Sequence, residues 1–201
     1  MPNPADSVIG LYDRNAERWD KDRLKILSEK NWLDRFLALT APGSTILDIG
    51  CGSGEPIARY FIEQGRLLTG VDSSQAMIAL CRKRFPLHDW QVADMRSLSL
   101  GRRFDGLLAW DSFFHLTEDA QRRMFPIFAA HATVGAPLMF TSGLVEGEAI
   151  GTYADEPLYH SSLDTAEYRA LLEANGFDVI RQVAHDPECD RHSVWLARKR
   201  A

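Results

Sequence analysis

The chain has 201 residues, enough for one domain with a full hydrophobic core. Its composition, 45% apolar and 25% charged, is ordinary for a globular protein, and a net charge of −5 excludes an electrostatic case for a general nucleic-acid or membrane-surface binder. The three cysteines, Cys51, Cys81 and Cys189, are widely separated and form neither a disulfide framework nor a metal-ligand spacing, which favours a reducing, cytoplasmic location.

No targeting or membrane-spanning segment is expected. Residues 1–10, MPNPADSVIG, lack the basic and apolar regions of a secretory signal peptide. No apolar run reaches the roughly 18 residues that cross a bilayer. We therefore expect a protein without a membrane partner.

Residues 1–40 predict helical structure ahead of the main fold. Leu11–Leu39 is rich in charge, and its apolar residues recur at helical spacing. A break near Ser28–Lys30 is expected to divide it into two helices, and Ala41–Gly43 ends the region.

Strands and helices then alternate. The expected strands are short and apolar: Thr45–Ile49, Leu67–Val71, His88–Ala93, Phe104–Trp110 and Leu138–Ser142. The expected helices between them are Glu55–Gln64, a segment capped by Ser73 or Ser74 that ends at Phe85, and a segment from Thr117 to Thr133. Pro126 lies inside the last helix and should kink or interrupt it.

The C-terminal part predicts a different arrangement. After a glycine-rich, acidic stretch without periodicity come signals for a strand, a capped helix and two further strands. The expected elements are a loop near the site, a short strand, a helix and an antiparallel hairpin: Gly143–Pro157, Leu158–Ser162, Asp164–Gly176, and Phe177–Ala184 with Ser193–Arg198.

This alternation predicts an α/β fold, a Rossmann-like, doubly wound, mostly parallel sheet with helices on both faces and a C-terminal antiparallel hairpin. Right-handed crossovers bring the carboxyl ends of the strands to one edge, where ligands bind beside the point at which strand order reverses. We expect one domain over residues 1–201, with N-terminal helices at 1–40, a ligand-binding core at 41–142, and a closing helix and hairpin at 143–201.

The stretch Ile46–Pro56, ILDIGCGSGEP, leads from a predicted strand directly into Gly50, Gly52 and Gly54. Glycine permits positive φ and removes the Cβ that would hold a ligand away from the main chain. The spacing differs from the dinucleotide fingerprint G-x-G-x-x-G, and Glu55 at the helix start would repel a pyrophosphate. The loop therefore predicts a polar ligand without phosphate.

Carboxylates follow the strands of the same edge. Asp72 ends the second strand, where an acid accepts hydrogen bonds from both hydroxyls of a ribose; its alternative role is to cap the next helix. Asp94 and Met95 follow the third strand, where they suit an exocyclic amine and a flat ring, or again a helix cap. Asp48, within the first strand, is expected to orient the glycine loop through backbone N–H groups.

Four segments together resemble a known family. ILDIGCGSG, GVDSS, VADMRSL and FDGLLAWDSFFHL are similar, in order and spacing over about residues 40–116, to motifs one to four of the class I S-adenosylmethionine-dependent methyltransferases. LEANGF and the hairpin after it resemble the closing helix and antiparallel pair of that family. YDRNAERWD resembles the lid segment Y-D-x-x-A-x-x-Y/W-D of its small-molecule members, so the resemblance covers nearly the whole chain.

The resemblance implies S-adenosyl-L-methionine as cofactor and S-adenosyl-L-homocysteine as product. It places the glycine loop against the aminoacyl part of the cofactor, Asp72 at the ribose, and Asp94 with Met95 at the adenine. Tyr12 and Trp19 would cover the cofactor from the lid, or instead pack the first helix on the domain. The residues expected to bind the cofactor are Tyr12, Trp19, Asp48, Gly50, Cys51, Gly52, Gly54, Asp72, Ser73, Met77, Asp94, Met95 and Trp110.

A general base is optional for methyl transfer, and two residues are candidates. His115 is the first, because it follows the fourth predicted strand and its unperturbed pKa is near neutral; packing is its alternative role. Asp111, at the end of the same strand, is the second. The histidines without a chemical constellation in the sequence are His88, His131, His185 and His192.

The segment after the fourth strand bears on the substrate. WDSF lacks the double proline of methyltransferases that act on adenine or glutamine amides, and no Asp-Asp or Asp-Asn pattern there predicts a metal. The leading hypothesis is therefore a cytoplasmic enzyme that methylates a small molecule, with neither a metal nor a nucleic-acid partner. The alternatives are a non-catalytic S-adenosylmethionine-binding protein or a subunit of a methylating complex and, less favoured, an NAD-dependent oxidoreductase.

Overall fold

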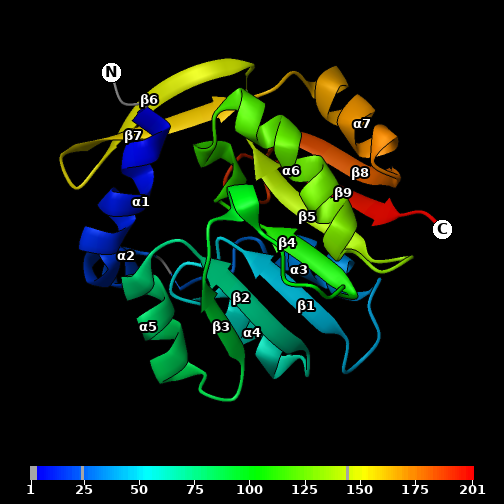
Figure 1. Ribbon diagram of the computed structural model, residues 1–201, viewed down its shortest axis with the longest axis horizontal. Coiled ribbons are helices and arrows are strands. Elements are labelled where there is room, and N and C mark those ends of the chain that lie inside the picture. Colours follow the sequence, from blue (N-terminus) through cyan, green and yellow to red (C-terminus); the bar gives the residue numbers. More distant parts are fainter. Residues whose placement is uncertain (1–3, 24, 144) are drawn as a thin grey trace.

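The structure, a computed structural model, describes residues 4–23, 25–143 and 145–201, and a seven-stranded sheet runs through its middle (Figure 1). The strands of this sheet are β1 (Thr45–Ile49), β2 (Leu67–Asp72), β3 (Asp89–Val92), β4 (Gly106–Ala109), β5 (Pro137–Ser142), β8 (Phe177–Asp186) and β9 (His192–Lys199). Their order is β3-β2-β1-β4-β5-β9-β8. β1 to β5 are parallel, whereas β9 runs antiparallel to β5 and β8 antiparallel to β9. The predicted doubly wound sheet with its C-terminal hairpin is confirmed.

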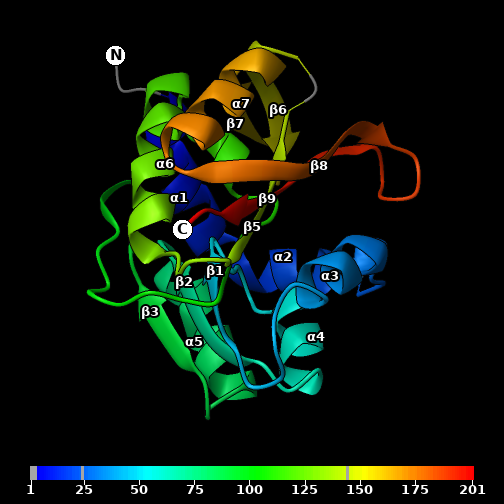
Figure 2. The same ribbon diagram turned by 90° about the vertical axis from the view of Figure 1, so that its right-hand side faces the viewer.

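Helices cover both faces of the sheet. They are α3 (Lys30–Leu37), α4 (Ile57–Glu63) and α5 (Gln75–Arg84) on one face, and α6 (Glu118–His131) and α7 (Thr165–Ala174) on the other. Figure 2 shows α6 on one side of the sheet and α3 and α4 on the opposite side. Among the helices in the described part of the chain, none combines the length and the hydrophobicity needed to cross a membrane.

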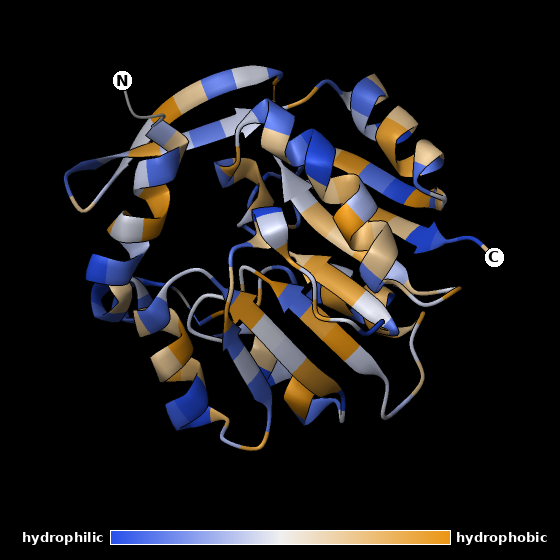
Figure 3. Cartoon of the chain, in the orientation of Figure 1, coloured by the Kyte–Doolittle hydropathy of each residue, from blue (hydrophilic) through white to orange (hydrophobic). Residues whose placement is uncertain are grey.

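The central strands are buried on both sides because successive side chains point to opposite faces. In β4, Leu107 and Ala109 belong to the core under α6 and α7, whereas Leu108 belongs to the core under α3, α4 and α5. Figure 3 shows the hydrophobic residues concentrated along these strands. Double burial therefore explains the unbroken apolar run in the sequence here.

Two elements differ from the sequence prediction. α6 continues through Pro126 as one helix, so of the two expected outcomes, a kink or an interruption, the interruption is absent. A proline in a helix removes one backbone hydrogen bond, and here the buried side chains of Met124, Phe125 and Phe128 keep the helix on the sheet. Gly143–Pro157 is not a loop, because it contains β6 (Gly147–Tyr153), which pairs antiparallel with β7 (Glu156–Ser162).

The sequence pattern could not show β6 because this strand has no buried residue. Without a buried face a strand lacks the alternation of apolar and polar residues that identifies it. β7 contributes the buried Leu158 and Tyr159 to a small core, and the partly buried Tyr153 at the end of β6 packs against it. The turn between the two strands uses Ala154 and Asp155 with φ of 52° and 64°, which is the geometry of a two-residue hairpin turn.

The N-terminal helices begin earlier than predicted. α1 (Pro4–Arg14) and α2 (Ala16–Asp22) precede α3, so three helices stand where the sequence predicted two. The buried side chains of α1 pack on those of β7 in a small third core. This contact holds α1 beside the carboxyl edge of the main sheet (Figure 1).

Phe140 offers a test of the larger core. It is fully buried in β5 and stacks on Trp195 with the ring centroids 5.8 Å apart. We predict that Phe140→Ala lowers the free energy of unfolding by about 3–5 kcal/mol, because it removes buried apolar surface and leaves a cavity. Chemical denaturation measures the change. Leu87→Ala is the control, since Leu87 is 95% exposed; equal effects of the two substitutions would contradict this description of the core.

Candidate active site

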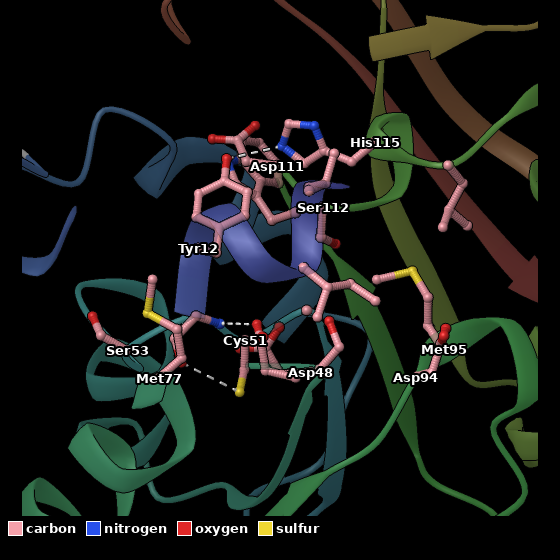
Figure 4. A pocket seen from close by; sticks show the side chains of 18 of the residues that line it. Tyr12, Asp48, Cys51, Ser53, Met77, Asp94, Met95, Asp111, Ser112 and His115 are labelled. Atoms are coloured by element: carbon pink, nitrogen blue, oxygen red, sulfur yellow. Dashed lines mark hydrogen bonds between the residues drawn. The ribbon is translucent and has the colours of Figure 1, made fainter. Parts of the chain in front are cut away.

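A pocket opens at the carboxyl ends of β1 to β4, beside the point where the strand order reverses. It encloses about 1180 Å³, part of it open to solvent. Every residue that the sequence predicted for cofactor binding or catalysis lines it. Figure 4 shows Tyr12, Asp111 and His115 on one side of the pocket, and Asp48 and Cys51 on the other.

The glycine loop brings bare main chain to this pocket. Gly50, Gly52 and Gly54 have φ of 76°, 54° and 78°. A Cβ on Gly50 would lie 2.2 Å from the Cβ of Ser112, so this glycine lets the loop after β4 approach the loop after β1. A Cβ on Gly52 would have no atom nearer than Trp19 Nε1, at 4.0 Å, and would occupy the pocket itself. Gly52 therefore leaves the main chain accessible to a ligand.

Asp72, the last residue of β2, holds this loop in place. Its Oδ2 accepts a hydrogen bond from the Gly52 N–H at 2.9 Å, and its Oδ1 accepts one from the Ser74 N–H at 2.8 Å. Burial raises the pKa of Asp72, and these backbone hydrogen bonds oppose the shift. The N-cap of α5 is Ser74, whose hydroxyl accepts from the Met77 N–H at 3.1 Å.

Asp48 lies in the middle of β1 and is 4% exposed. Burial raises its pKa to about 7, and no described residue donates a hydrogen bond to its carboxylate. The expectation that Asp48 orients the loop through N–H groups was wrong, because Asp72 receives the Gly52 N–H. A buried carboxylate without a partner is costly, so Asp48 marks a place where a bound donor or cation would be stabilised.

Asp94 caps the 3₁₀ helix η1 (Met95–Ser97). Its Oδ1 accepts from the Arg96 N–H at 2.9 Å, and the Arg96 guanidinium donates to Oδ2 at 2.6 Å. Burial would raise the pKa of Asp94, but the hydrogen bonds from Arg96 hold it below its usual value. Arg96 also reaches Asp6 of α1 at 3.0 Å, so this corner of the pocket is tied to the N-terminal helix.

α1 and α2 are fastened over the pocket by polar contacts to α5. Asp13 accepts a hydrogen bond from the Ala76 N–H at 3.0 Å, and Asp20 forms an ion pair with Arg84. Hydrogen bonds from backbone and side chain lower the pKa of Asp13, which therefore stays ionised. These contacts fix α1 and α2 at the open side of the pocket.

Three aromatic rings lie on that side. Tyr12 and Trp19 meet edge to face with centroids 5.2 Å apart, and Tyr153 of β6 lies 5.3 Å from Trp19. Burial is the main reason why the pKa of Tyr12 is raised, so its hydroxyl stays protonated. The strand that the sequence did not predict thus supplies a ring that packs behind Tyr12 and Trp19.

His115 is buried in the 3₁₀ helix η2 (Phe113–His115) and has partners at both ring nitrogens. Nδ1 lies 2.8 Å from the Tyr159 carbonyl oxygen, and Nε2 lies 3.0 Å from the Tyr12 hydroxyl. Burial lowers the pKa of His115 to about 4, so the ring is neutral at pH 7. Nδ1 therefore donates to the carbonyl, and Nε2 accepts from Tyr12 (Figure 4).

Asp111 forms a charged pair that the sequence did not indicate. Its Oδ1 lies 2.9 Å from His192 Nε2, and His192 Nδ1 lies 2.8 Å from the Cys189 carbonyl. Both nitrogens face acceptors, so the ring is an imidazolium. Burial opposes this charge, but Asp111 raises the pKa of His192 to about 11. The statement that His192 has no chemical constellation was wrong.

Backbone geometry and topology create this pair. Asp111 has φ of 48°, a left-handed conformation that few residues other than glycine adopt and that asparagine and aspartate tolerate best. β9 returns antiparallel beside β5, which carries His192 to the carboxyl edge. Arg23 Nη1 lies 3.6 Å from Asp111 Oδ2 on the other side. Within the described residues, no group of His, Cys, Asp or Glu side chains is arranged to hold a metal ion.

A match to a known protein family supports this arrangement of the site residues. The family model described as "Methyltransferase domain" matches residues 46–134. The matched span begins in β1 and ends just beyond α6, so it contains the glycine loop, Asp72, Asp94, Asp111 and His115.

Two relatives act as reference points. The dTDP-3-amino-3,6-dideoxy-alpha-D-glucopyranose N,N-dimethyltransferase of Streptomyces fradiae is 33% identical over 166 residues, which cover 76% of this chain and 64% of that protein. The dTDP-4-amino-2,3,4,6-tetradeoxy-D-glucose N,N-dimethyltransferase of Saccharopolyspora spinosa is 27% identical over 161 residues, 76% of this chain and 61% of that protein. The chain thus spans about three fifths of the length of these curated relatives.

Solved structures share the fold. CalS10 from Micromonospora echinaspora, an amino pentose methyltransferase, superposes with a TM-score of 0.74 at 18% identity, over 92% of this chain and 96% of that one. The 1,6-didemethyltoxoflavin-N1-methyltransferase of Burkholderia thailandensis gives 0.74 at 19% identity, over 100% and 92%. The resemblance found in the sequence is confirmed, because residues 46–134 match the model of a methyltransferase domain and the chain shares the fold of these solved methyltransferases.

Proposed function

We propose that this protein is an S-adenosylmethionine-dependent methyltransferase that transfers a methyl group in line to a small-molecule acceptor. The observation that carries the proposal is the pocket wall, where the bare main chain at Gly52 lies with the buried carboxylate of Asp48 and the half-buried carboxylate of Asp72. The names of the relatives and of the superposed structures, which include small-molecule methyltransferases, support the same reaction.

The chemistry of this wall fits the cofactor. When bound, S-adenosylmethionine supplies an electrophilic methyl group on a cationic sulfonium. The acceptor's lone pair would form the new bond to the methyl carbon, and the sulfur would keep the electron pair of the broken sulfur–methyl bond. Asp48 and the main chain at Gly52 would hold the aminoacyl part, because an unpartnered carboxylate suits an ammonium group. Asp72 would hold the ribose hydroxyls. Glu55 lines the same loop and disfavours a phosphate-bearing ligand.

The remaining residues on the cofactor side of the pocket would contact the bound cofactor and exclude water from it. Met95 and Met77 offer polarisable side chains to the adenine ring, and Ser73 and Cys51 complete the wall. Tyr12 and Trp19 would cover the cofactor from α1 and α2, which is the lid role. Alignment of reactants in such a closed site contributes about 7–11 kcal/mol at best.

The two candidate catalytic residues, His115 and Asp111, differ in whether their polar atoms already have hydrogen-bond partners. His115 is neutral, and its Nε2 is occupied by the Tyr12 hydroxyl, so we propose that it positions Tyr12. Asp111 is ionised, and its Oδ2 accepts no hydrogen bond from the described residues. We therefore propose Asp111 as the residue that faces the acceptor.

The alternatives remain distinct. A non-catalytic S-adenosylmethionine-binding protein would use the same pocket without turnover, and an NAD-dependent oxidoreductase would need the phosphate-binding loop that Glu55 disfavours. A cytoplasmic location is part of the proposal, since the structure leaves Cys51, Cys81 and Cys189 as free thiols.

Calorimetry and a turnover assay test the proposal. We expect the purified protein to bind S-adenosylmethionine and S-adenosylhomocysteine but not NAD, because the loop has no feature that would bind a pyrophosphate. Methyl transfer to members of a small-molecule library would then separate the enzyme from a binding protein. Binding of NAD in preference to both adenosyl compounds would overturn the assignment.

Asp72 provides a sharper test. Asp72→Asn should weaken S-adenosylhomocysteine binding about 10- to 100-fold, because the ribose hydroxyls lose a charged acceptor. Calorimetry gives the affinity, and circular dichroism checks the fold. Asp89→Asn is the matched control, since Asp89 starts β3 and pairs with Arg102 outside the pocket wall. Unchanged affinity in Asp72→Asn would remove the ribose role.

The Asp111–His192 pair predicts a pH effect on stability. The folded-state pKa of His192 is about 11 and its ordinary value 6.5, so the stabilisation is fully present below pH 6.5 and is lost as the pH rises toward 11. The difference in unfolding free energy between wild type and Asp111→Asn should therefore shrink over that interval. NMR should find the pKa of His192 near 6.5 in Asp111→Asn. A His192 pKa that stays near 11 in this variant would contradict the pairing.

A further inference from the structure

A second cavity lies against the first. It encloses about 980 Å³, part of it open to solvent, between α2, residues 26–29 and the β8–β9 turn. The residues that line both cavities are Trp19, Arg23, Trp110 and Asp111. A molecule in the second cavity would therefore meet the proposed cofactor site at these side chains.

The wall of this cavity has more acidic than basic groups. Its carboxylates are Asp22, Glu29, Asp111 and Asp190, and its cationic groups are Arg23 and His192. Both cations already have acidic partners, because Arg23 lies 3.3 Å from Glu29 and His192 lies 2.9 Å from Asp111. An excess of negative charge in a concave site attracts a cation and repels a phosphate.

Aromatic side chains complete the wall. Trp19, Trp110 and Tyr153 line the cavity. The Tyr153 hydroxyl is buried and has no hydrogen-bond partner within the described residues. Aromatic faces beside carboxylates favour an organic cation, and an unpartnered hydroxyl can bond to a polar group of the same ligand.

We propose that the second cavity binds the methyl acceptor and that this acceptor is a small organic amine held by Asp111, an inference that rests on the function proposed above. Asp111 Oδ1 is taken by His192. Asp111 Oδ2 has Arg23 as a charged neighbour at 3.6 Å, which is too long for a hydrogen bond. Oδ2 thus has Arg23 as an ion-pair partner but accepts no hydrogen bond from the described residues, so it can accept an amine N–H at the boundary of the two cavities.

The state of Asp111 suits recognition of the amine. Burial would raise the pKa of Asp111, but the hydrogen bond from His192 holds it below its usual value, so the side chain is a carboxylate. A primary or secondary amine has N–H donors in both its protonated and its neutral form, and Asp111 accepts from either. This contact leaves the lone pair of the neutral amine unoccupied and available as the nucleophile.

The test compares three probes at neutral pH: benzylamine, benzyl alcohol and thymidine diphosphate. Calorimetry first measures S-adenosylhomocysteine binding. If S-adenosylhomocysteine does not bind, the proposed function is contradicted but the amine proposal is not. The probes are then titrated into the protein without S-adenosylhomocysteine. Otherwise they are titrated into the protein saturated with S-adenosylhomocysteine, and the indole N–H signals of Trp19 and Trp110 report the binding.

We expect benzylamine to bind saturably, at least about tenfold more tightly than benzyl alcohol, and thymidine diphosphate not to bind. Asp111→Asn should weaken benzylamine binding about tenfold and leave benzyl alcohol binding unchanged. Asp178→Asn is the matched control, since Asp178 lies near the start of β8, away from the cavity, with a side chain 67% exposed.

Asp22→Asn gives a second measurement that does not depend on the folding of Asp111→Asn. The Asp22 side chain is 51% exposed at the cavity rim, so this substitution should produce a smaller loss of benzylamine binding in the same direction. Equal affinity for amine and alcohol, failure of benzylamine to bind, tighter binding of thymidine diphosphate, or amine binding unaffected by both substitutions would each overturn the proposal.

Discussion

The close approach of two loops where the strand order reverses is the constraint on which the site depends. The loop after β1 and the loop after β4 meet at Gly50 and Ser112, with no room for a Cβ on the glycine. A side chain at this position would push the loops apart and separate Asp72 from Asp111 across the pocket. Gly50 is thus required because the two loops pack closely there, whereas Gly52 is required because a side chain would keep a ligand away from the main chain. The two glycines nevertheless look alike in the sequence.

Closure by α1 and α2 determines the electrostatics of the pocket. Burial is the largest cause of the shifted pKa values of Asp48, Tyr12 and His115. Part of that burial comes from the N-terminal helices, which are held by contacts such as the Asp20–Arg84 ion pair. A carboxylate with a pKa of about 7 is poorly stabilised until a cationic or hydrogen-bonding ligand reaches it. The same closure that excludes water therefore increases the preference for a positively charged ligand.

Much of the fold could be predicted because it is encoded locally. The parallel strands are apolar runs bounded by turn residues, and Asp72 and the glycine loop follow such runs directly. β6 could not be predicted in this way, because a strand with no buried residue has no hydrophobic pattern. The role of Asp48 could not be predicted either. A carboxylate in β1 has several N–H groups within sequence reach, and only the three-dimensional register shows that Asp72 receives the one from Gly52.

The two histidines of the site show most clearly why sequence position is a weak guide to chemistry. His115 follows a recognisable motif, yet its partners are a carbonyl and a hydroxyl, neither of which stabilises a charge strongly enough to offset burial. His192 follows no motif and is partly buried, yet its partner is the carboxylate of Asp111, so its ring is an imidazolium. The partner decides the protonation state, and the partner is set by the antiparallel return of β9 beside β5. One ring of the site is therefore neutral and held by α1 and β7, whereas the other is cationic and held by Asp111 at the boundary of the two cavities.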